Sequence, residues 1–441
     1  MKIRRPGVRY SFNLPTFGKN QNQYTLKKYL VLVLLKSILI PGLVAQNWIV
    51  YSDTTSGLPT NKVRVIAIDN EQTKWLGTYG GGLVRYDDTT WTVYNMANSQ
   101  LPNNSIVTLA IDKEQNIWMG TLGDGVCRFD GTYWEIFNTA NSPLPNDWIY
   151  NLAFDDDQCI WVGTANGLAK YNGSEWVVFD STETGIPIRD IRSVIFDDGG
   201  NMWLGTYYDG VVKYNGTDWT VFDTLNSGLP YSTVYAIAID GEQQKWFGTS
   251  AYGRGIALFD DDEWRIFDEE NSDIPGNNIS HIAIDAYQNK WVTTVGGGGI
   301  GKYNDIEWTV FDTNNSGLPS NTVWNIVIDQ YQNKWIGTNN GLAVYNENGI
   351  HPGVHETMPH NQLVLVYPVP ARNTLYISPT DVNTKFVQIS VFNVSGQILK
   401  NCHYDSQHEQ ISIDVSMLNS GIYFLHIQSE RYFVTKKILI K

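Results

Sequence analysis

The chain has 441 residues and a formal net charge of −14, with 42% hydrophobic and 17% charged residues. This composition is typical of folded globular proteins, and its acidic balance argues against binding to nucleic acid or to anionic lipid. The three cysteines are too few for a disulfide framework. The 16 Trp and 25 Tyr are unusual and require a structural explanation.

Residues 1–45 have the character of a secretory signal peptide. They contain eight basic residues and no acidic one, and an apolar run over residues 29–44 ends at the small residue Ala45. A basic stretch followed by a short apolar stretch and a small residue is typical of such signals. The alternative is an N-terminal membrane anchor, but Lys36 and Pro41 interrupt the run. It is also shorter than the roughly 20 residues that span a bilayer. Removal of the eight basic charges would leave a net charge of −22.

Two series of tryptophans define seven internal repeats, the feature to be sought first in a long chain. In both series successive tryptophans are separated by 43, 43, 42, 43, 45 and 44 residues. The first series is Trp48, Trp91, Trp134, Trp176, Trp219, Trp264 and Trp308. The second is Trp75, Trp118, Trp161, Trp203, Trp246, Trp291 and Trp335. Because their neighbours are fixed, we interpret these tryptophans as core residues between repeats rather than as ligand platforms.

Each repeat is predicted to form four short strands, which in the first full copy cover residues 65–69, 75–78, 82–86 and 91–94. The first of these is apolar throughout and is expected to be buried on both faces, as an innermost strand would be. Turn residues separate the strands. Four antiparallel strands every 40-odd residues are typical of a β-propeller blade. The sequence therefore predicts an all-β, seven-bladed β-propeller over residues 46–350.

The two ends of the repeat array predict how the ring closes. The first copy begins with an isolated fourth strand at residues 48–51, and the last copy has three strands and no further Trp. The N-terminal strand would complete the seventh blade and leave no exposed sheet edge.

The repeat also resembles a known family. The pattern Asp-x5-Trp-Leu-Gly-Thr-x-x-Gly-Gly-Leu-x-x-Tyr over residues 69–86 resembles the two-component regulator propeller repeat, and the copies cover about 300 residues. That family occurs in sensor ectodomains of hybrid two-component systems that detect polysaccharide breakdown products. The resemblance implies the propeller fold and a glycan as the class of ligand. A resemblance to streptogramin lyases, which are also seven-bladed, exists only at the level of the fold.

The loops between the second and third strands predict the binding face. The number of residues from the second-strand Trp to the following Tyr or Phe varies between 10 and 13, whereas the other intervals are constant. A rigid scaffold with variable loops on one side is a common way to build a binding surface. Aromatic rings beside arginines suit sugars, and the arginines also suit the carboxylates of acidic sugars. The candidate ligand-binding residues are Trp148, Trp324, Tyr150, Tyr235, Arg64, Arg192, Arg254, Tyr207, Tyr252 and His281.

These residues favour binding over catalysis, and the sequence predicts no catalytic residue, metal or cofactor. His281 is the only His among residues 46–350, so a site with several His ligands is excluded. Two alternatives remain open, a polysaccharide or streptogramin-type lyase that acts at the same face, with His281 as base, and a protein-binding scaffold or adhesin. The expected state is a monomer, with no nucleic-acid partner and no stable membrane span after signal removal.

Residues 364–441 are predicted to form a small β-sandwich after a linker over residues 351–363. Short alternating strands are expected at residues 375–377, 387–392, 411–413, 422–427 and 432–440. The segments 366–370, 396–398, 413–416, 418–423 and 436–441 resemble the type A C-terminal sorting domain of type IX secretion. Val369 departs from that family, which usually has Asn between the two prolines. The resemblance implies passage through the outer membrane by the type IX machinery, followed by release or surface attachment.

Overall fold

The structure is a computed structural model of the chain. It describes residues 46–186, 188–250 and 252–350, and then residues 364–367, 371–379, 386–393, 398–403, 411–429 and 433–440. The predicted signal peptide, the predicted linker and the segments 368–370 and 396–397 of the sorting motif lie outside these residues.

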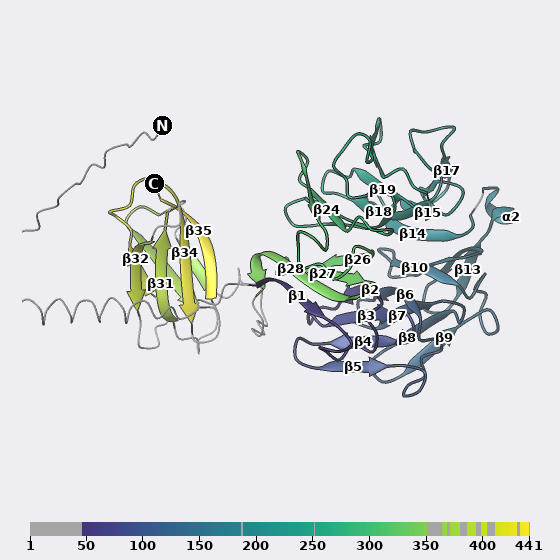
Figure 1. The fold of residues 1–441 in the computed structure, drawn as a ribbon, viewed down its shortest axis with the longest axis horizontal. Helices are drawn as coiled ribbons and strands as arrows, with labels where there is room; N and C mark the ends of the chain where they lie inside the picture. The colour runs from purple at the N-terminus through teal and green to yellow at the C-terminus, as the bar shows by residue number, and fades with distance from the viewer. Residues whose placement is uncertain are drawn as a thin grey trace, which may run out of the picture. The chain divides into compact units, whose positions relative to one another are not determined.

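Residues 46–350 form seven four-stranded antiparallel sheets, as the repeats predict. The innermost strands of successive sheets contact one another, and the last of them contacts the first, so the sheets form a closed ring (Figure 1). These innermost strands are β2 (Val63–Ile68), β6 (Ile106–Ile111), β10 (Ile149–Phe154), β14 (Ile191–Phe196), β18 (Val234–Ile239), β22 (Ile279–Ile284) and β26 (Val323–Ile328).

The second strands form the fully buried layer of every blade. All five residues of each are buried, with no alternation. The expectation that the innermost strand is buried on both faces is therefore wrong, because that strand also borders a central cavity and several of its residues are only partly buried. The second strands are β3 (Lys74–Thr78), β7 (Ile117–Thr121), β11 (Ile160–Thr164), β15 (Met202–Thr206), β19 (Lys245–Thr249), β23 (Lys290–Thr294) and β27 (Lys334–Thr338).

The third and fourth strands complete the blades. The third strands are β4 (Leu83–Tyr86), β8 (Val126–Phe129), β12 (Gly167–Tyr171), β16 (Val211–Tyr214), β20 (Ile256–Phe259), β24 (Ile300–Tyr303) and β28 (Gly341–Ile350). The fourth strands are β5 (Trp91–Tyr94), β9 (Trp134–Phe137), β13 (Trp176–Phe179), β17 (Trp219–Phe222), β21 (Trp264–Phe267) and β25 (Trp308–Phe311). Strand β1 (Gln46–Tyr51) is the fourth strand of the last blade and pairs with β28, which confirms the predicted closure. A four-residue helix, α2 (Ser181–Thr184), lies between two blades.

Two side-chain contacts account for the constant spacings in the repeat. In every blade the Trp of the second strand donates a hydrogen bond from Nε1 to the Asp six residues earlier, over 2.8 to 3.0 Å. In every blade the Tyr or Phe of the third strand stacks on the Trp of the fourth strand, and the centroids of the two rings are 4.0 to 4.9 Å apart. The repeated tryptophans thus belong to the scaffold, as predicted.

The C-terminal residues form two further antiparallel sheets around one apolar core. The first contains β29 (Val364–Tyr367), β30 (Thr374–Pro379) and β33 (Ile411–Asp414). The second contains β31 (Phe386–Phe392), β32 (Ile398–His403), β34 (Gly421–Ser429) and β35 (Phe433–Ile440). The fold is therefore all-β, with a seven-bladed propeller and a small β-sandwich, as predicted.

Candidate functional site

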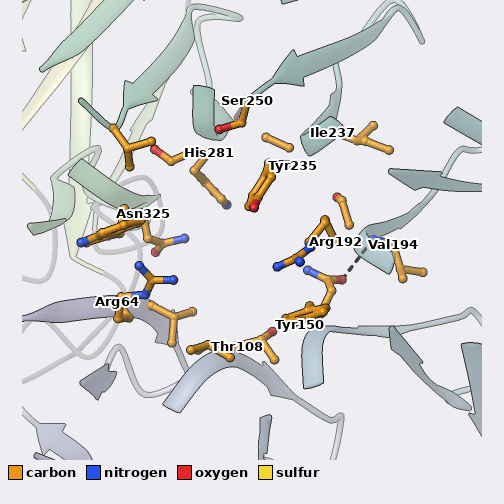
Figure 2. A pocket seen from close by; sticks show the side chains of 18 of the residues that line it. Arg64, Thr108, Tyr150, Arg192, Val194, Tyr235, Ile237, Ser250, His281 and Asn325 are labelled. Atoms are coloured by element: carbon orange, nitrogen blue, oxygen red, sulfur yellow. Dashed lines mark hydrogen bonds between the residues drawn. The ribbon is translucent and has the colours of Figure 1, made fainter. Parts of the chain in front are cut away.

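A cavity of about 1060 Å³ lies among the innermost strands of the propeller (Figure 2). Its wall consists of residues from all seven of these strands, together with residues from the loops between second and third strands and between blades. The volume is at the upper end of the range of roughly 300–1,000 Å³ found for small-molecule sites. The cavity thus has the size of a ligand site.

A β-bulge at the start of each innermost strand directs one side chain into this cavity. In the first blade Val63 pairs with Thr78 and Val65 with Gly77, so that Arg64 is an extra residue with no partner in the register. The same shift occurs in the other six blades. Bulges of this kind re-aim a side chain and often occur next to functional sites. The bulged residues in blade order are Arg64, Val107, Tyr150, Arg192, Tyr235, Ser280 and Trp324, and all seven line the cavity.

Arg64 is held against an aromatic ring of the neighbouring blade. Its Cζ lies 3.6 Å from the ring centroid of Trp324, whose Nε1 donates to Asn339 Oδ1 over 2.9 Å. Burial lowers the pKa of the Arg64 guanidinium, and the positive charge of Arg192 contributes to the shift. The group nevertheless keeps its proton, because an arginine pKa lies far above neutral pH.

Arg192 occupies a different environment on the opposite side of the cavity (Figure 2). Its Cζ lies 3.6 Å from the ring centroid of Tyr150, and the rings of Tyr207 and Tyr235 are 4.9 and 5.1 Å away. Its Nη2 lies 2.6 Å from Oδ1 of Asp190. Burial raises the pKa of Asp190, although the charge of Arg192 opposes this shift. Arg192 is therefore a paired cation inside an aromatic box.

At the next position of the innermost strand, asparagine side chains link neighbouring blades in two places. Asn151 Oδ1 accepts a hydrogen bond from Val194 N, and Asn325 Oδ1 accepts one from Ile66 N, each over 3.1 Å. His281 occupies the same position in the sixth blade, where its Nδ1 is buried and has no hydrogen-bond partner among the described residues. Burial lowers the pKa of His281 to about 4, so the imidazole is neutral at neutral pH.

The cavity rim carries exposed aromatic side chains from the loops. Trp148 is 50% exposed and Tyr252 is 89% exposed, and both line the cavity. Of the ten predicted site residues, Arg254 alone does not line the cavity, and its side chain is exposed. The cavity wall thus brings together nine of the ten predicted residues, and Arg254 lies outside it.

The sequence reasoning did not identify Asp190, the partner of the cavity residue Arg192. It lies two positions before Arg192, and its positive φ of 50° places it in a turn that leads into β14. Because Asp190 lies in this turn and a β-bulge follows it, strand alternation does not predict its contact with Arg192.

Comparisons with known proteins identify both parts of the chain. Residues 365–441 match the secretion system C-terminal sorting domain, and residues 100–123 and 143–166 match the two component regulator propeller. The comparison with curated proteins finds no match. Within the described residues, no helix is both long and apolar enough to cross a membrane.

Solved structures show the same propeller fold. The extracellular domain of a putative hybrid two component system from B. thetaiotaomicron matches with a TM-score of 0.60 and 18% identity, over 90% of this chain and 57% of that one. PorZ, an essential surface component of the type-IX secretion system of Porphyromonas gingivalis, matches with a TM-score of 0.55 and 16% identity, over 89% of this chain and 60% of that one. A streptogramin B lyase matches with a TM-score of 0.56 and 12% identity, over 68% of this chain and 97% of that one.

These likenesses establish the fold alone, and the chain spans 57% of the length of the two component system domain and 60% of PorZ. The family models identify the repeats and the C-terminal domain directly, and the sorting domain implies an interaction with the secretion machinery. The chain therefore carries two component regulator propeller repeats and a secretion system C-terminal sorting domain, and the sorting domain indicates export to the cell surface or secretion.

Proposed function

We propose that this exported protein binds a glycan or oligosaccharide in the central cavity of its propeller. The observation that carries the proposal is that the two guanidinium groups in the cavity wall each stack on an aromatic ring from a neighbouring blade. Sugar rings offer apolar faces to aromatic side chains and hydroxyl groups to polar ones, so this wall suits them. The cavity volume of about 1060 Å³ is sufficient for a short oligosaccharide.

We also propose that the chain loses its N-terminal signal peptide during export. A signal peptide over residues 1–45 would be removed before the sorting domain is used, and residues 351–363 would connect the propeller to that domain. The mature chain would then start at Gln46, which is the first residue of strand β1. Cleavage at this point would leave the closing strand of the ring intact.

Isothermal titration against a panel of oligosaccharides tests the proposal. We expect Trp148→Ala and Trp324→Ala to weaken binding roughly three- to tenfold each, because each removes an aromatic contact worth about 0.5–1.5 kcal/mol. Tyr287→Ala is the matched control, since Tyr287 is 70% exposed and lies outside the cavity wall. Absence of binding to every oligosaccharide, or full affinity in both Trp variants, would contradict glycan binding in this cavity.

A lyase is the second candidate, and one observation favours it. The Nδ1 of His281 is buried in the cavity region without a hydrogen-bond partner among the described residues, and its lowered pKa keeps the imidazole neutral. A neutral imidazole can accept a proton at neutral pH. Elimination from a polysaccharide would create an unsaturated product that absorbs ultraviolet light. Absence of this absorbance with every polysaccharide tested, or its persistence in His281→Asn, would remove His281 as a base.

A further inference from the structure

We infer that the ligand carries an anionic group, the carboxylate of a uronic acid or a sulfate ester, and that Arg64 is the residue that binds this group. The inference rests on the proposed function and deepens it, because it specifies acidic rather than neutral oligosaccharides. It follows from a comparison of the two arginines of the cavity.

Arg192 has a counter-ion and Arg64 has none among the described residues. The carboxylate of Asp190 lies 2.6 Å from Arg192. For Arg64 the described part of the chain supplies no ion pair, and its guanidinium contacts the face of the Trp324 ring. Burial nevertheless disfavours its charge, as the lowered pKa indicates. A desolvated cation without a partner costs free energy, and an anion supplied by a ligand would recover that cost.

The guanidinium of Arg64 is also preorganised. It lies 3.6 Å from the centroid of the Trp324 ring, and the hydrogen bond from Trp324 to Asn339 fixes the position of that ring. A guanidinium that is stacked on an aromatic face keeps its N–H groups at its edge, where they can bind an oxyanion through two parallel hydrogen bonds. Figure 2 shows Arg64 reaching into the open centre of the cavity.

The two sides of the cavity therefore suit different parts of one ligand. The side of Arg64 offers a net positive charge to the anionic group. The side of Arg192 offers an ion pair, in which Asp190 can accept hydrogen bonds from hydroxyl groups while the charge of the arginine is already balanced. A protein with a net charge of −14 thus carries an unbalanced positive charge at the centre of its binding region.

The binding experiment uses the full mature chain and four probes of matched length. Tetragalacturonate carries carboxylates, its methyl ester has the same rings without charge, a carrageenan tetrasaccharide carries sulfates, and maltotetraose is neutral. We expect binding of tetragalacturonate or the sulfated probe, and at least tenfold weaker binding in Arg64→Met, because the variant loses the charge-assisted hydrogen bonds to the anionic group. Arg265→Met, which changes an exposed arginine of strand β21 outside the cavity wall, is expected to bind as the wild type does.

Each outcome of the titration has a distinct meaning. Tetragalacturonate alone identifies a carboxylate as the anionic group, and the carrageenan probe alone identifies a sulfate. Binding of maltotetraose or the methyl ester with equal affinity in the wild type and Arg64→Met would overturn the inference and leave glycan binding intact. Unchanged affinity of Arg64→Met for an anionic probe would overturn it as well. Absence of binding to all four probes would contradict the proposed function itself.

Thermal unfolding provides a readout without any ligand. Methionine keeps the packing of the side chain and removes the charge. Because Arg64 lacks a counter-ion among the described residues, we expect Arg64→Met to unfold at the same temperature as the wild type or at a higher one. Arg192→Met should unfold at a lower temperature, since it leaves Asp190 without its cation. An equal loss in both variants would show that Arg64 has a structural partner and would overturn the inference.

Discussion

The second strand and the innermost strand lie side by side in every blade, but they differ in how much their residues change from blade to blade. The second strands carry Trp at the same position in all seven copies, and every residue in them is buried. The bulged position of the innermost strands holds five different residue types in seven copies. The second strands therefore maintain the geometry of the ring, and the bulges use that geometry to present different chemistry to one cavity.

The same difference separates individual tryptophans. Trp203 is fully buried in the second strand of the fourth blade and donates to Asp197 over 2.9 Å. Trp148 is 50% exposed at the rim of the cavity. Residue type alone therefore says little about a tryptophan in this fold, and its register within the repeat determines whether it stabilises the ring or faces a ligand.

Substitution of these two tryptophans gives the largest expected effect. Trp203→Ala should lower the free energy of unfolding by about 3–5 kcal/mol, because it creates a cavity and removes one of the hydrogen bonds that Asp197 accepts, although Asn201 still donates to that carboxylate. Trp148→Ala should change it by less than about 1 kcal/mol, because the side chain is half exposed. Chemical denaturation of both variants measures the difference. Equal losses in the two variants would contradict the division between scaffold and cavity.

The fold could be predicted almost completely from the sequence because its determinants are local and repeated. The six-residue spacing from Asp to Trp reflects one hydrogen bond, and the five-residue spacing from Tyr or Phe to Trp reflects one ring stack. Both contacts recur in all seven blades, so their spacing is visible without a structure. Closure by strand β1 was predictable for the same reason, since the fourth strand missing at one end is present at the other.

The cavity was predictable only in part, because its details depend on contacts between blades. The β-bulge changes the direction of a side chain without leaving a mark in the repeat, so the common role of Arg64, Val107 and Ser280 was not apparent. Arg254 was placed at the site by its loop, although its side chain lies outside the cavity wall. The pairing of Asp190 with Arg192 required the turn geometry before β14.

The pH dependence of stability tests the contribution of one residue of the innermost strands, His281. The pKa of His281 falls from an ordinary value of 6.5 to about 4 in the folded protein. Between pH 6.5 and pH 4 the unfolded chain therefore binds a proton that the folded chain does not, and His281 lowers stability as the pH falls through this range. The loss is at most about 3 kcal/mol, since one pKa unit corresponds to about 1.4 kcal/mol.

His281→Asn should remove this contribution, so the unfolding free energy of the variant should fall less steeply than that of the wild type between pH 6.5 and pH 4. Asparagine occupies the same position in the third and seventh blades, where its side chain accepts a hydrogen bond from the next blade. The variant is therefore expected to retain the ring. Denaturant titrations at several pH values test this, and parallel curves for the two proteins would show that folding does not lower the pKa of His281.

Substitution of the lysine that precedes the second-strand Trp gives the smallest expected effects. Two such lysines test whether the same position contributes equally to stability in different blades. Lys290 is 4% exposed and lies 2.6 Å from Asp305 and 3.6 Å from Asp240, which is also buried. Lys290→Met should destabilise the protein by about 1–3 kcal/mol, because it leaves a buried carboxylate without its cation.

Lys334 is the matched comparison, since it lies at the same position of the seventh blade. Its Nζ donates to the carbonyl oxygen of Gln332 over 3.0 Å and lies 4.9 Å from the ring centroid of Trp291, and burial lowers its pKa. Three other blades have Ile117, Ile160 and Met202 at this position, so an apolar side chain fits there. Lys334→Met should therefore change the unfolding free energy by less than about 1 kcal/mol. A loss equal to that of Lys290→Met would mean that the cation itself, rather than its carboxylate partner, stabilises the contact between blades.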